Sequence, residues 1–234
     1  MKAVILAAGE GKRLGLGIPK ALVKVNELSL IERAILFFTS LNIKDFVIVV
    51  GYKAEQVKRF LLESKVVGDK KISWVENEEF WRGNGLSVFC VRDYVEEHFL
   101  LSMVDHVFDT SPLLNFPQHL GDLVCVVDSN PRFVDFEEAT KVLIEQDEVK
   151  RIGKNLTDYN AVDCGLFLCS RKIFPVLEEA LEEGEEEWND AKDRFARKFG
   201  ARAFDLKGQF WLDVDTPEEL LRAERLLRER ECRR

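Results

Sequence analysis

The sequence predicts an α/β domain of the doubly wound type, with a mostly parallel sheet between layers of helices. Its 234 residues, 46% hydrophobic and 32% charged, fit a folded chain of one large domain or two small ones. Short apolar runs alternate with longer helical patterns through the first half of the chain, which is typical of βαβ units. We therefore expect a single domain that spans residues 1–234.

Each expected element rests on a local pattern. Apolar runs of strand length predict strands at Lys2–Ala7, Asp45–Val50, Lys71–Val75, Phe99–Val104 and Asp122–Val127. Helical spacing predicts helices at Ser29–Leu41, Ala54–Glu63 and Leu86–Val95. Further β-type stretches predict a small antiparallel subdomain at about residues 129–170, with strands near Thr140–Ile144, Val149–Ile152 and Ala161–Cys169. A last helix is expected from Thr216, because an N-cap, a proline and a capping-box glutamate follow in Thr216-Pro217-Glu218-Glu219.

Composition and charge argue against several classes of protein. The net charge of −8 disfavours a nucleic-acid binder, since such proteins neutralise phosphates with a basic surface. No apolar run approaches the roughly 20 residues of a membrane span, and the first residues lack a signal-peptide cleavage site, so we expect a cytoplasmic chain. The five scattered cysteines indicate reduced core thiols. We interpret the acidic stretch Glu178–Glu187 as a solvated helix face and its connecting loop.

A glycine-rich stretch follows the first strand, from Ala7 to Lys20, and is typical of a loop that binds phosphate. Small residues let backbone N–H groups approach the oxygens of a triphosphate, while Lys12, Arg13 and Lys20 add positive charge. The stretch lacks the third glycine of a dinucleotide-binding fingerprint and the Gly-Lys-Ser/Thr of a Walker A loop. The alternative is a flexible glycine turn with exposed cations.

Carboxylates follow two of the expected strands, at the edge of the sheet where open α/β folds bind ligands. Asp105 comes directly after the strand that ends at Val104, and Asp213 and Asp215 lie in a late apolar run. The two-residue period of a strand puts Asp213 and Asp215 on one face, so either is able to complete a Mg²⁺ site with Asp105. Asp215 is also a candidate for the cap of the last helix, and His106 for packing or an outer-shell role.

These motifs resemble a known family. The run Leu6-Ala7-Ala8-Gly9-x-Gly11-x-Arg13-Leu14, followed by Pro19-Lys20, is similar to the signature loop of the sugar-phosphate nucleotidyltransferases. The resemblance implies a Rossmann-like, three-layer nucleotidyltransferase fold with a mixed, mostly parallel central sheet. It also implies that the loop holds a nucleoside triphosphate, with Lys20 close to its α-phosphate.

Later segments resemble one branch of that family, the CTP:inositol-1-phosphate cytidylyltransferases. The branch is indicated by the order of the segments Pro131–Asp135, Glu138–Lys141, Ile152–Lys154 and Val162–Gly165. The run Gly83-Asn84-Gly85-Leu86-Ser87 is similar to the family's base-binding segment, with a plain helix start after a glycine turn as the alternative. The resemblance assigns nucleotide binding to Ala7, Ala8, Gly9, Gly11, Lys12, Arg13, Asn84, Gly85 and Ser87. It assigns acceptor binding to Lys141, Lys154, Asp163 and Gly165.

The implied reaction transfers CMP from CTP to inositol 1-phosphate and gives CDP-inositol and pyrophosphate. The acceptor phosphate has a second pKa of about 6, so it attacks as a dianion without a general base. Alignment and charge neutralisation carry such transfers, and we expect Lys20, Arg13 and Asp105 to be catalytic. Mg²⁺ is expected on Asp105 together with Asp213 or Asp215. Relatives divide between the two, and we favour Asp213.

Other functions fit part of the sequence. A cytidylyl- or uridylyltransferase acting on phosphocholine or a sugar 1-phosphate would use the same chemistry. A nucleotide-sensing module would bind a triphosphate without turnover, and a glycosyltransferase would not need the basic loop. The resemblance also implies a fused or cooperating membrane CDP-alcohol phosphotransferase, which would tether the domain to a membrane. Together the two would make di-myo-inositol phosphate solutes in thermophiles, to which the high content of Glu, Lys and Arg is suited.

Overall fold

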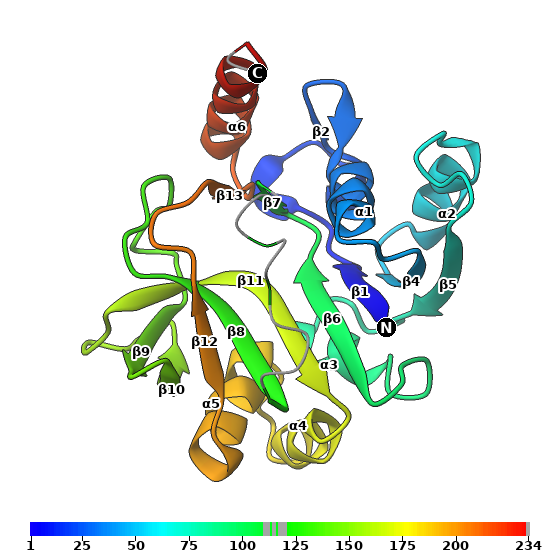
Figure 1. The fold of residues 1–234 in the computed structure, drawn as a ribbon. Coiled ribbons are helices and arrows are strands. Elements are labelled where there is room, and N and C mark those ends of the chain that lie inside the picture. The colour runs from blue at the N-terminus through cyan, green and yellow to red at the C-terminus, as the bar shows by residue number, and fades with distance from the viewer. Residues whose placement is uncertain (110–112, 114–115, 117–120, 233–234) are drawn as a thin grey trace.

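A nine-stranded mixed sheet forms the centre of the fold (Figure 1). The computed structural model describes residues 1–109, 113, 116 and 121–232. In chain order the strands are β1 (Lys2–Ala7), β2 (Lys24–Val25), β3 (Leu28–Ser29), β4 (Asp45–Val50), β5 (Lys71–Glu76), β6 (His98–Met103), β7 (His106–Phe108), β8 (Leu123–Asp128), β9 (Lys141–Glu145), β10 (Glu148–Gly153), β11 (Ala161–Ser170), β12 (Arg202–Asp205) and β13 (Trp211–Asp213). The helices are α1 (Leu30–Ser40), α2 (Ala54–Glu63), α3 (Asn84–Phe89), α4 (Ile173–Glu182), α5 (Trp188–Phe199) and α6 (Pro217–Glu231).

The strand order brings the carboxyl ends of β1 and β6 together. Across the sheet the order is β5-β4-β1-β6-β11-β8-β12-β10-β9, and β5, β4, β1 and β6 run parallel. Strand β11 is antiparallel to both of its neighbours in this order, β6 and β8, so the sheet is mixed. Leu6 of β1 lies beside Met103 of β6. The loops that follow these two strands therefore leave the sheet at the same edge, where open α/β folds bind ligands.

Helices cover both faces of the sheet (Figure 1). Alternate residues of a strand point to opposite faces, and β1 follows this rule. Ala3, Ile5 and Ala7 belong to the core that contains the buried residues of α1 and α2. Val4 and Leu6 belong to the core that contains those of α3, α4 and α5. The expected three-layer α/β fold with a mixed central sheet is thereby confirmed.

Several expected elements have the expected bounds. These are the strands Lys2–Ala7 and Asp45–Val50 and the helix Ala54–Glu63. The last helix also begins as expected, because the Thr216 hydroxyl accepts from the Glu219 N–H at 3.2 Å to form a capping box. None of the described helices is long and apolar enough to span a bilayer.

The helix expected at Leu86–Val95 is wrong in its bounds, because α3 begins at Asn84 and ends at Phe89. After Phe89 the chain continues in turns, in which the N–H of Arg92 donates to the Phe89 carbonyl at 3.2 Å. Val91 and Val95, which follow α3, are nevertheless buried in the core on this face of the sheet. Their apolar spacing, which predicted a longer helix, is therefore satisfied without one.

The second half of the chain differs more from the expectation. Strands β9 and β10 form an antiparallel pair, as expected, but β9 also pairs with β11, so they extend the central sheet. No bounds were predicted for the α4 and α5 helices. The glutamates of Glu178–Glu187 lie on α4 and on the connection to α5, in agreement with their interpretation as a helix face and loop. All five cysteines are free; three are buried, whereas Cys90 is half-buried and Cys232 is exposed.

Candidate active site

The loop after β1 folds back so that Lys20 lies against its glycines. Gly11 and Gly15 take left-handed conformations, with φ of 69° and 68°, and the buried Leu14 anchors the turn between them. The N–H of Lys20 donates to the carbonyl of Gly9 at 3.2 Å. A Cβ atom on Gly11 would lie 3.1 Å from the Cβ of Lys20, so this close approach favours glycine.

Backbone donors in this loop are left unused by the protein. None of the N–H groups of residues 9–13 donates to an acceptor within the part of the chain that the structure describes. The Lys12 side chain is largely exposed, with its ammonium 3.5 Å from a carboxylate oxygen of Glu10. A run of free N–H groups beside the cations of Lys12 and Arg13 suits phosphate oxygens as acceptors.

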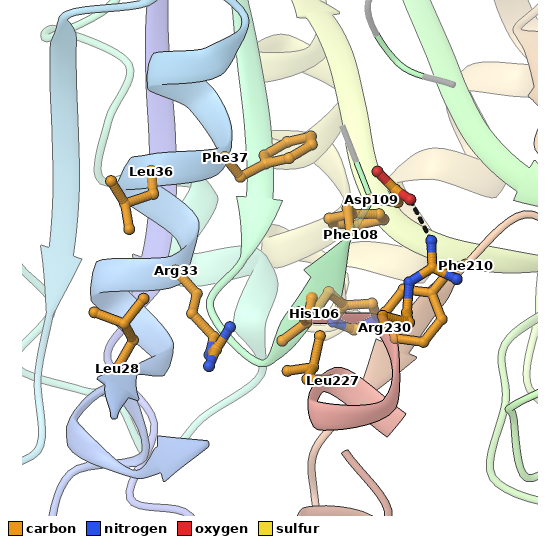
Figure 2. Close-up of a pocket in the computed structure, with 11 residues that line it drawn as sticks. Leu28, Arg33, Leu36, Phe37, His106, Phe108, Asp109, Phe210, Leu227 and Arg230 are labelled. Atoms are coloured by element: carbon orange, nitrogen blue, oxygen red, sulfur yellow. Dashed lines mark hydrogen bonds and ion pairs between the residues drawn. The ribbon is translucent and has the colours of Figure 1, made fainter. Parts of the chain in front are cut away.

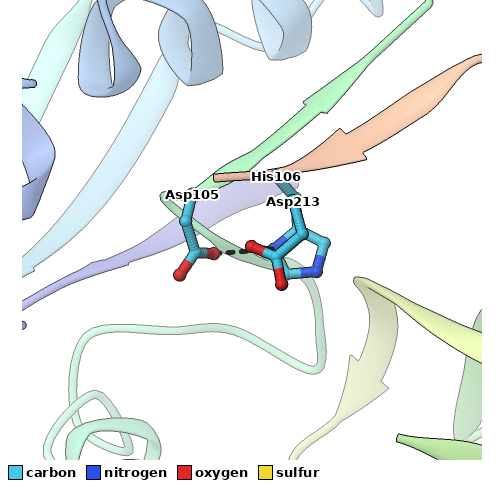
Figure 3. A group of neighbouring side chains, drawn as sticks. All are labelled: Asp105, His106 and Asp213. Carbon is cyan, nitrogen blue, oxygen red and sulfur yellow. Dashed lines mark hydrogen bonds and ion pairs between the residues drawn. The ribbon is translucent and has the colours of Figure 1, made fainter. Parts of the chain in front are cut away.

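Two carboxylates from distant parts of the chain meet beside His106 (Figure 3). Asp105 lies in the turn between β6 and β7, while the pairing of β7 with β13 places Asp213 opposite His106. Oδ1 of Asp105 is 2.6 Å from Nδ1 of His106, and Oδ1 of Asp213 is 3.9 Å from the same nitrogen. The His106 ring also stacks on that of Trp211, with centroids 5.8 Å apart. His106 therefore combines packing with contact to the carboxylates.

Two cations connect these carboxylates to the loop after β1. The buried ammonium of Lys20 donates to Asp105 and to Oδ1 of Asp215. Arg13 donates to Oδ2 of Asp215 at 2.5 Å and to Glu138 at 3.2 Å. Both oxygens of Asp215 are therefore engaged by cations, and the three expected catalytic residues belong to one network.

Burial and charge shift the pKa values of this network in opposite directions. Burial alone would raise the pKa of Asp105, but the Lys20 ammonium and His106 hold it well below its ordinary value. Burial raises the pKa of Asp213 to about 7, with help from the carboxylates of Asp105 and Asp215 and against the effect of His106. Burial would lower the pKa of His106, but Asp213 and Asp105 raise it to about 9. Burial and the neighbouring carboxylates of Asp105 and Asp215 thus disfavour the charged form of Asp213.

The donor set fits a divalent cation. Asp105, His106 and Asp213 each offer one ligand atom within 4.8 Å of the others. Oδ1 of Asp213 is buried and has no hydrogen-bond partner among the described residues. Buried polar atoms rarely lack a partner, and a carboxylate oxygen is a preferred ligand of hard cations such as Mg²⁺. A cation on the oxygens of Asp105 and Asp213 would give the free atom a partner.

A polar cavity of about 260 Å³ opens beside the carboxylates. Its lining includes Lys154, which follows β10, and residues of β11, α5 and β13. A Cβ atom on Gly165 would lie 2.6 Å from the His106 ring, so glycine at this point of β11 makes room for the imidazole. Eight of the residues predicted from the sequence line the cavity, namely Arg13, Asn84, Asp105, Lys154, Asp163, Gly165, Asp213 and Asp215.

Other predicted residues lie outside the lining of this cavity. Lys141 does not reach it, because its ammonium donates to the Glu137 carbonyl at 3.1 Å. The structure therefore does not support the expected contact between Lys141 and the acceptor. Lys20 lies behind Asp105 and Asp215 rather than in the lining. The remaining loop residues predicted for nucleotide binding, Ala7, Ala8, Gly9, Gly11 and Lys12, are also absent from the lining.

The segment expected to bind the base is held mainly by the fold. The N–H of Gly85 donates to the Glu186 carbonyl at 2.9 Å, and the Ser87 hydroxyl accepts from Asn77 at 2.9 Å. These contacts of Gly85 and Ser87 fit the alternative interpretation of the segment, a plain helix start after a glycine turn. Asn84 differs, because it lines the polar cavity while its Oδ1 accepts from the Trp188 N–H at 2.8 Å.

Sequence reasoning missed three residues of α5 that line the cavity, namely Trp188, Asn189 and Lys192. Lys192 is 1% exposed, and its ammonium donates to Asp163. A signal was present, because Trp188, Ala191, Lys192 and Phe195 follow the three- and four-residue spacing of a buried helix face. A lysine on an apolar helix face indicates a buried charge with a partner in the interior.

A second cavity, of about 240 Å³, lies between α1, β7 and α6 (Figure 2). Much of its lining is apolar, with Phe37 and Leu227 among its residues, and Arg230 donates to Asp109 beside it. It shares His106 with the polar cavity. Within the described parts of the chain, none of the residues predicted to bind nucleotide, acceptor or metal lines it. The polar cavity is therefore the candidate active site.

Comparisons with known proteins agree with this geometry. The family model described as MobA-like NTP transferase domain matches residues 3–195. The chain is 38% identical over 228 residues to the bifunctional IPC transferase and DIPP synthase of Rubrobacter xylanophilus. It is 35% identical over 229 residues to the protein of the same name from Aquifex aeolicus. Each match covers 96% of this chain and 51% of the relative, so the chain spans about half the length of these relatives.

A solved structure has the same fold. The inositol-1-phosphate CTP transferase from T. maritima matches with a TM-score of 0.85 at 25% identity, and the match covers 96% of each chain. The Rossmann-like nucleotidyltransferase fold expected from the sequence is therefore confirmed. Since the family model covers well over half of the residues, the chain belongs to the family of MobA-like NTP transferase domains.

Proposed function

We propose that this chain is a cytidylyltransferase that transfers CMP from CTP to inositol 1-phosphate, giving CDP-inositol and pyrophosphate. One observation carries the proposal: the basic loop, the carboxylate cluster and the polar cavity meet at one edge of the sheet. The names of the relatives, an IPC transferase and an inositol-1-phosphate CTP transferase, support this choice of substrates.

The loop after β1 would bind the triphosphate of CTP. Its free N–H groups at residues 9–13 supply donors, and Lys12 and Arg13 would neutralise the departing pyrophosphate. Lys20 would lie at the α-phosphate, since the loop and the carboxylates hold its ammonium at their junction. Asn84 is the residue of the base-binding segment that lines the cavity.

Asp105 and Asp213 would hold Mg²⁺. Nucleotidyltransferases generally use divalent metal ions, and a bound ion would supply charge neutralisation at the phosphates. Asp213 is the better second ligand, because its Oδ1 has no partner among the described residues. Both oxygens of Asp215 are engaged instead, by Lys20 and Arg13. Asp215 would thus position the cations that face the phosphates.

The acceptor would lie in the polar cavity with its phosphate toward Lys154. The ammonium of Lys154 makes no hydrogen bond or ion pair with any described residue, and Lys154 lines the cavity. The inositol ring would face Asp163, which lines the same cavity and is buried, whereas Lys154 is exposed. At neutral pH the acceptor phosphate is largely a dianion, since its second pKa is about 6, and no general base is needed. The residues of the loop, the carboxylate cluster and the cavity would align the two substrates and balance their charge.

Pyrophosphate release tests the proposal. All four NTPs would be combined with Mg²⁺ and with inositol 1-phosphate, phosphocholine or glucose 1-phosphate, using Asp105→Asn as the inactive control. We expect the highest kcat/KM for CTP with inositol 1-phosphate. A higher kcat/KM with phosphocholine or glucose 1-phosphate would show that inositol 1-phosphate is not the preferred acceptor. Saturable CTP binding without pyrophosphate release with any acceptor would contradict the proposed enzyme activity and favour a nucleotide-sensing module.

The product is proposed to feed a second enzyme. The bifunctional relatives combine IPC transferase with DIPP synthase in chains that extend well beyond the matched region. We propose that a membrane CDP-alcohol phosphotransferase, fused or cooperating, consumes the CDP-inositol on the cytoplasmic side. CDP-inositol labelled in its inositol ring would be added, with inositol or inositol 1-phosphate as the hydroxyl acceptor, to membranes of the source organism. It should yield a labelled inositol phosphodiester and release CMP, and unchanged CDP-inositol would contradict this step.

A further inference from the structure

Lys192 is a charged residue within the buried face of α5. Its neighbours on that face, Trp188, Ala191 and Phe195, are each at most 1% exposed, and Lys192 itself is 1% exposed. It also lines the polar cavity, so its ammonium lies between the core and the space proposed for the acceptor. Burying a charge costs free energy, and apolar residues often replace buried ion pairs without loss of stability. Stability alone therefore does not explain a lysine at this position.

The ammonium of Lys192 has one hydrogen-bond partner in the described part of the chain. It donates to Oδ2 of Asp163, whose Oδ1 accepts from the Gly165 N–H at 2.8 Å. An ammonium has three donors, so two are left for other acceptors. The indole nitrogen of Trp188, which lines the same cavity, is also buried without a partner among the described residues. The cavity thus offers unfilled donors next to one carboxylate, which suits hydroxyl groups that both accept and donate.

The same ammonium occupies two aromatic faces. Its nitrogen lies 4.2 Å from the ring centroid of Phe167 and 5.9 Å from that of Trp188. Both residues line the cavity. Aromatic faces attract cations, and quaternary ammonium ligands are commonly bound in this way. Here the protein fills that place with its own cation, which would repel a positively charged ligand.

We propose that Lys192 is a specificity-determining residue, which selects a neutral polyol phosphate as acceptor and rejects a cationic one such as phosphocholine. Its ammonium donates to ring hydroxyls while Asp163 accepts from them, and its charge repels a trimethylammonium group. Discrimination here combines an attractive and a repulsive element. The proposal rests on the proposed function, because it concerns the acceptor of the same reaction.

The test compares two acceptors with CTP and Mg²⁺ in the wild type and in Lys192→Met. For Lys192→Met we expect kcat/KM for inositol 1-phosphate to fall by about tenfold or more, since donors to substrate hydroxyls are lost. We expect kcat/KM for phosphocholine to rise by about tenfold, because two aromatic faces become free for a cation. Lys192→Arg keeps the charge and should continue to reject phosphocholine.

Controls separate the proposal from a change of stability. Lys198→Met removes an exposed lysine of the same helix, paired with Glu179, and should leave both kcat/KM values unchanged. If Lys192→Met does not fold, the neutral pair Asp163→Asn with Lys192→Met removes the unpaired carboxylate and should show the same shift toward phosphocholine. An unchanged ratio of the two kcat/KM values in the folded variant would overturn the role of Lys192. Absence of turnover by the wild type with inositol 1-phosphate would instead overturn the proposed function.

Discussion

Lys20 is the residue at which the phosphate loop and the carboxylate cluster meet. Its N–H is bonded to Gly9 within the loop, while its ammonium contacts Asp105 and Asp215. Burial would lower the pKa of Lys20, but the carboxylates of Asp105, Asp213 and Asp215 hold it above its ordinary value. The side chain therefore stays charged at neutral pH. A fixed charge at this junction is able to act on phosphate oxygens without rearrangement.

Removing either partner of this ion pair should abolish most of the activity. We expect Lys20→Ala and Asp105→Asn each to lower kcat for pyrophosphate release by at least about a hundredfold, the scale of losing one preorganised electrostatic group. Far-UV circular dichroism should show a retained fold. Lys44→Ala removes an exposed lysine paired with Asp69 and serves as the control, with unchanged kcat. Near-normal turnover of either site variant would exclude the proposed role.

The ribbon of β7 and β13 is the element that brings Asp213 to Asp105. Its position depends on Asp128 at the end of β8, which is fully buried. Asp128 accepts from the Trp211 indole N–H at 2.9 Å, from the Gly208 N–H at 2.7 Å and from the Asn130 N–H at 3.0 Å. One carboxylate thus fixes the chain before β13 and the ring on which His106 stacks.

Loss of this carboxylate should destabilise the molecule. In Asp128→Ala three donors lose their acceptor, and we expect the free energy of unfolding to fall by about 3 kcal/mol, at about 1 kcal/mol for each. Asp128→Asn keeps one acceptor oxygen and should cost less. Urea unfolding followed by tryptophan fluorescence measures both. Equal stability of Asp128→Ala and the wild type would show that the ribbon is held by other contacts.

The N-terminus of α6 is a smaller element with a direct link to the site. Glu219 accepts from the N–H groups of Asp215 and Thr216, and the Thr216 hydroxyl accepts from the Glu219 N–H. We expect Thr216→Ala to lower the free energy of unfolding by about 1 kcal/mol, the usual cost of losing an N-cap. Thr157→Ala, at an exposed threonine between β10 and β11, is the matched control and should change stability by less than about 0.5 kcal/mol. Equal effects of the two substitutions would argue against the cap.

The whole molecule is built on two cores, one on each face of the sheet. Cys164 lies in the core with α1 and α2, and Cys125 and Cys169 lie in the core with α3, α4 and α5. Burial raises the pKa of the Cys125 thiol to about 12 and raises those of Cys164 and Cys169 well above their ordinary value. Because the thiolate is the reactive form, these three groups should be inert while both cores stay closed.

Thiol labelling therefore reports on the integrity of both cores. With an aromatic disulfide reagent at neutral pH, we expect the exposed Cys232 to react first and the half-buried Cys90 more slowly. The three buried thiols should react only after denaturant unfolds the chain. Cys232→Ser should remove the fast phase and nothing else. Rapid labelling of more than two thiols in the native protein would contradict the packing of the cores.

Local patterns predicted the elements that local interactions determine. The bounds of β1, β4 and α2 and the start of α6 follow from apolar spacing and capping residues. The local sequence patterns did not predict which distant segments pair with each other. The two-residue period predicted Asp213 and Asp215 on one strand face, but β13 ends at Asp213, which its pairing with β7 places opposite His106. The helical spacing around Lys192 was a local signal of its burial, but its pairing with Asp163 on another element could not be predicted.

The central claim is that the CMP group of CTP, which contains the α-phosphorus, is transferred to the acceptor. Following that phosphorus tests the claim most directly. The enzyme would be incubated with Mg²⁺, inositol 1-phosphate and CTP that carries a radiolabel at the α-phosphorus. We predict that the label moves into CDP-inositol, a diester that resists alkaline phosphatase, and that unlabelled pyrophosphate is released in equal amount. Asp105→Asn should leave the label in CTP. Label that remains in CTP, CDP or CMP with the wild-type enzyme would contradict the account.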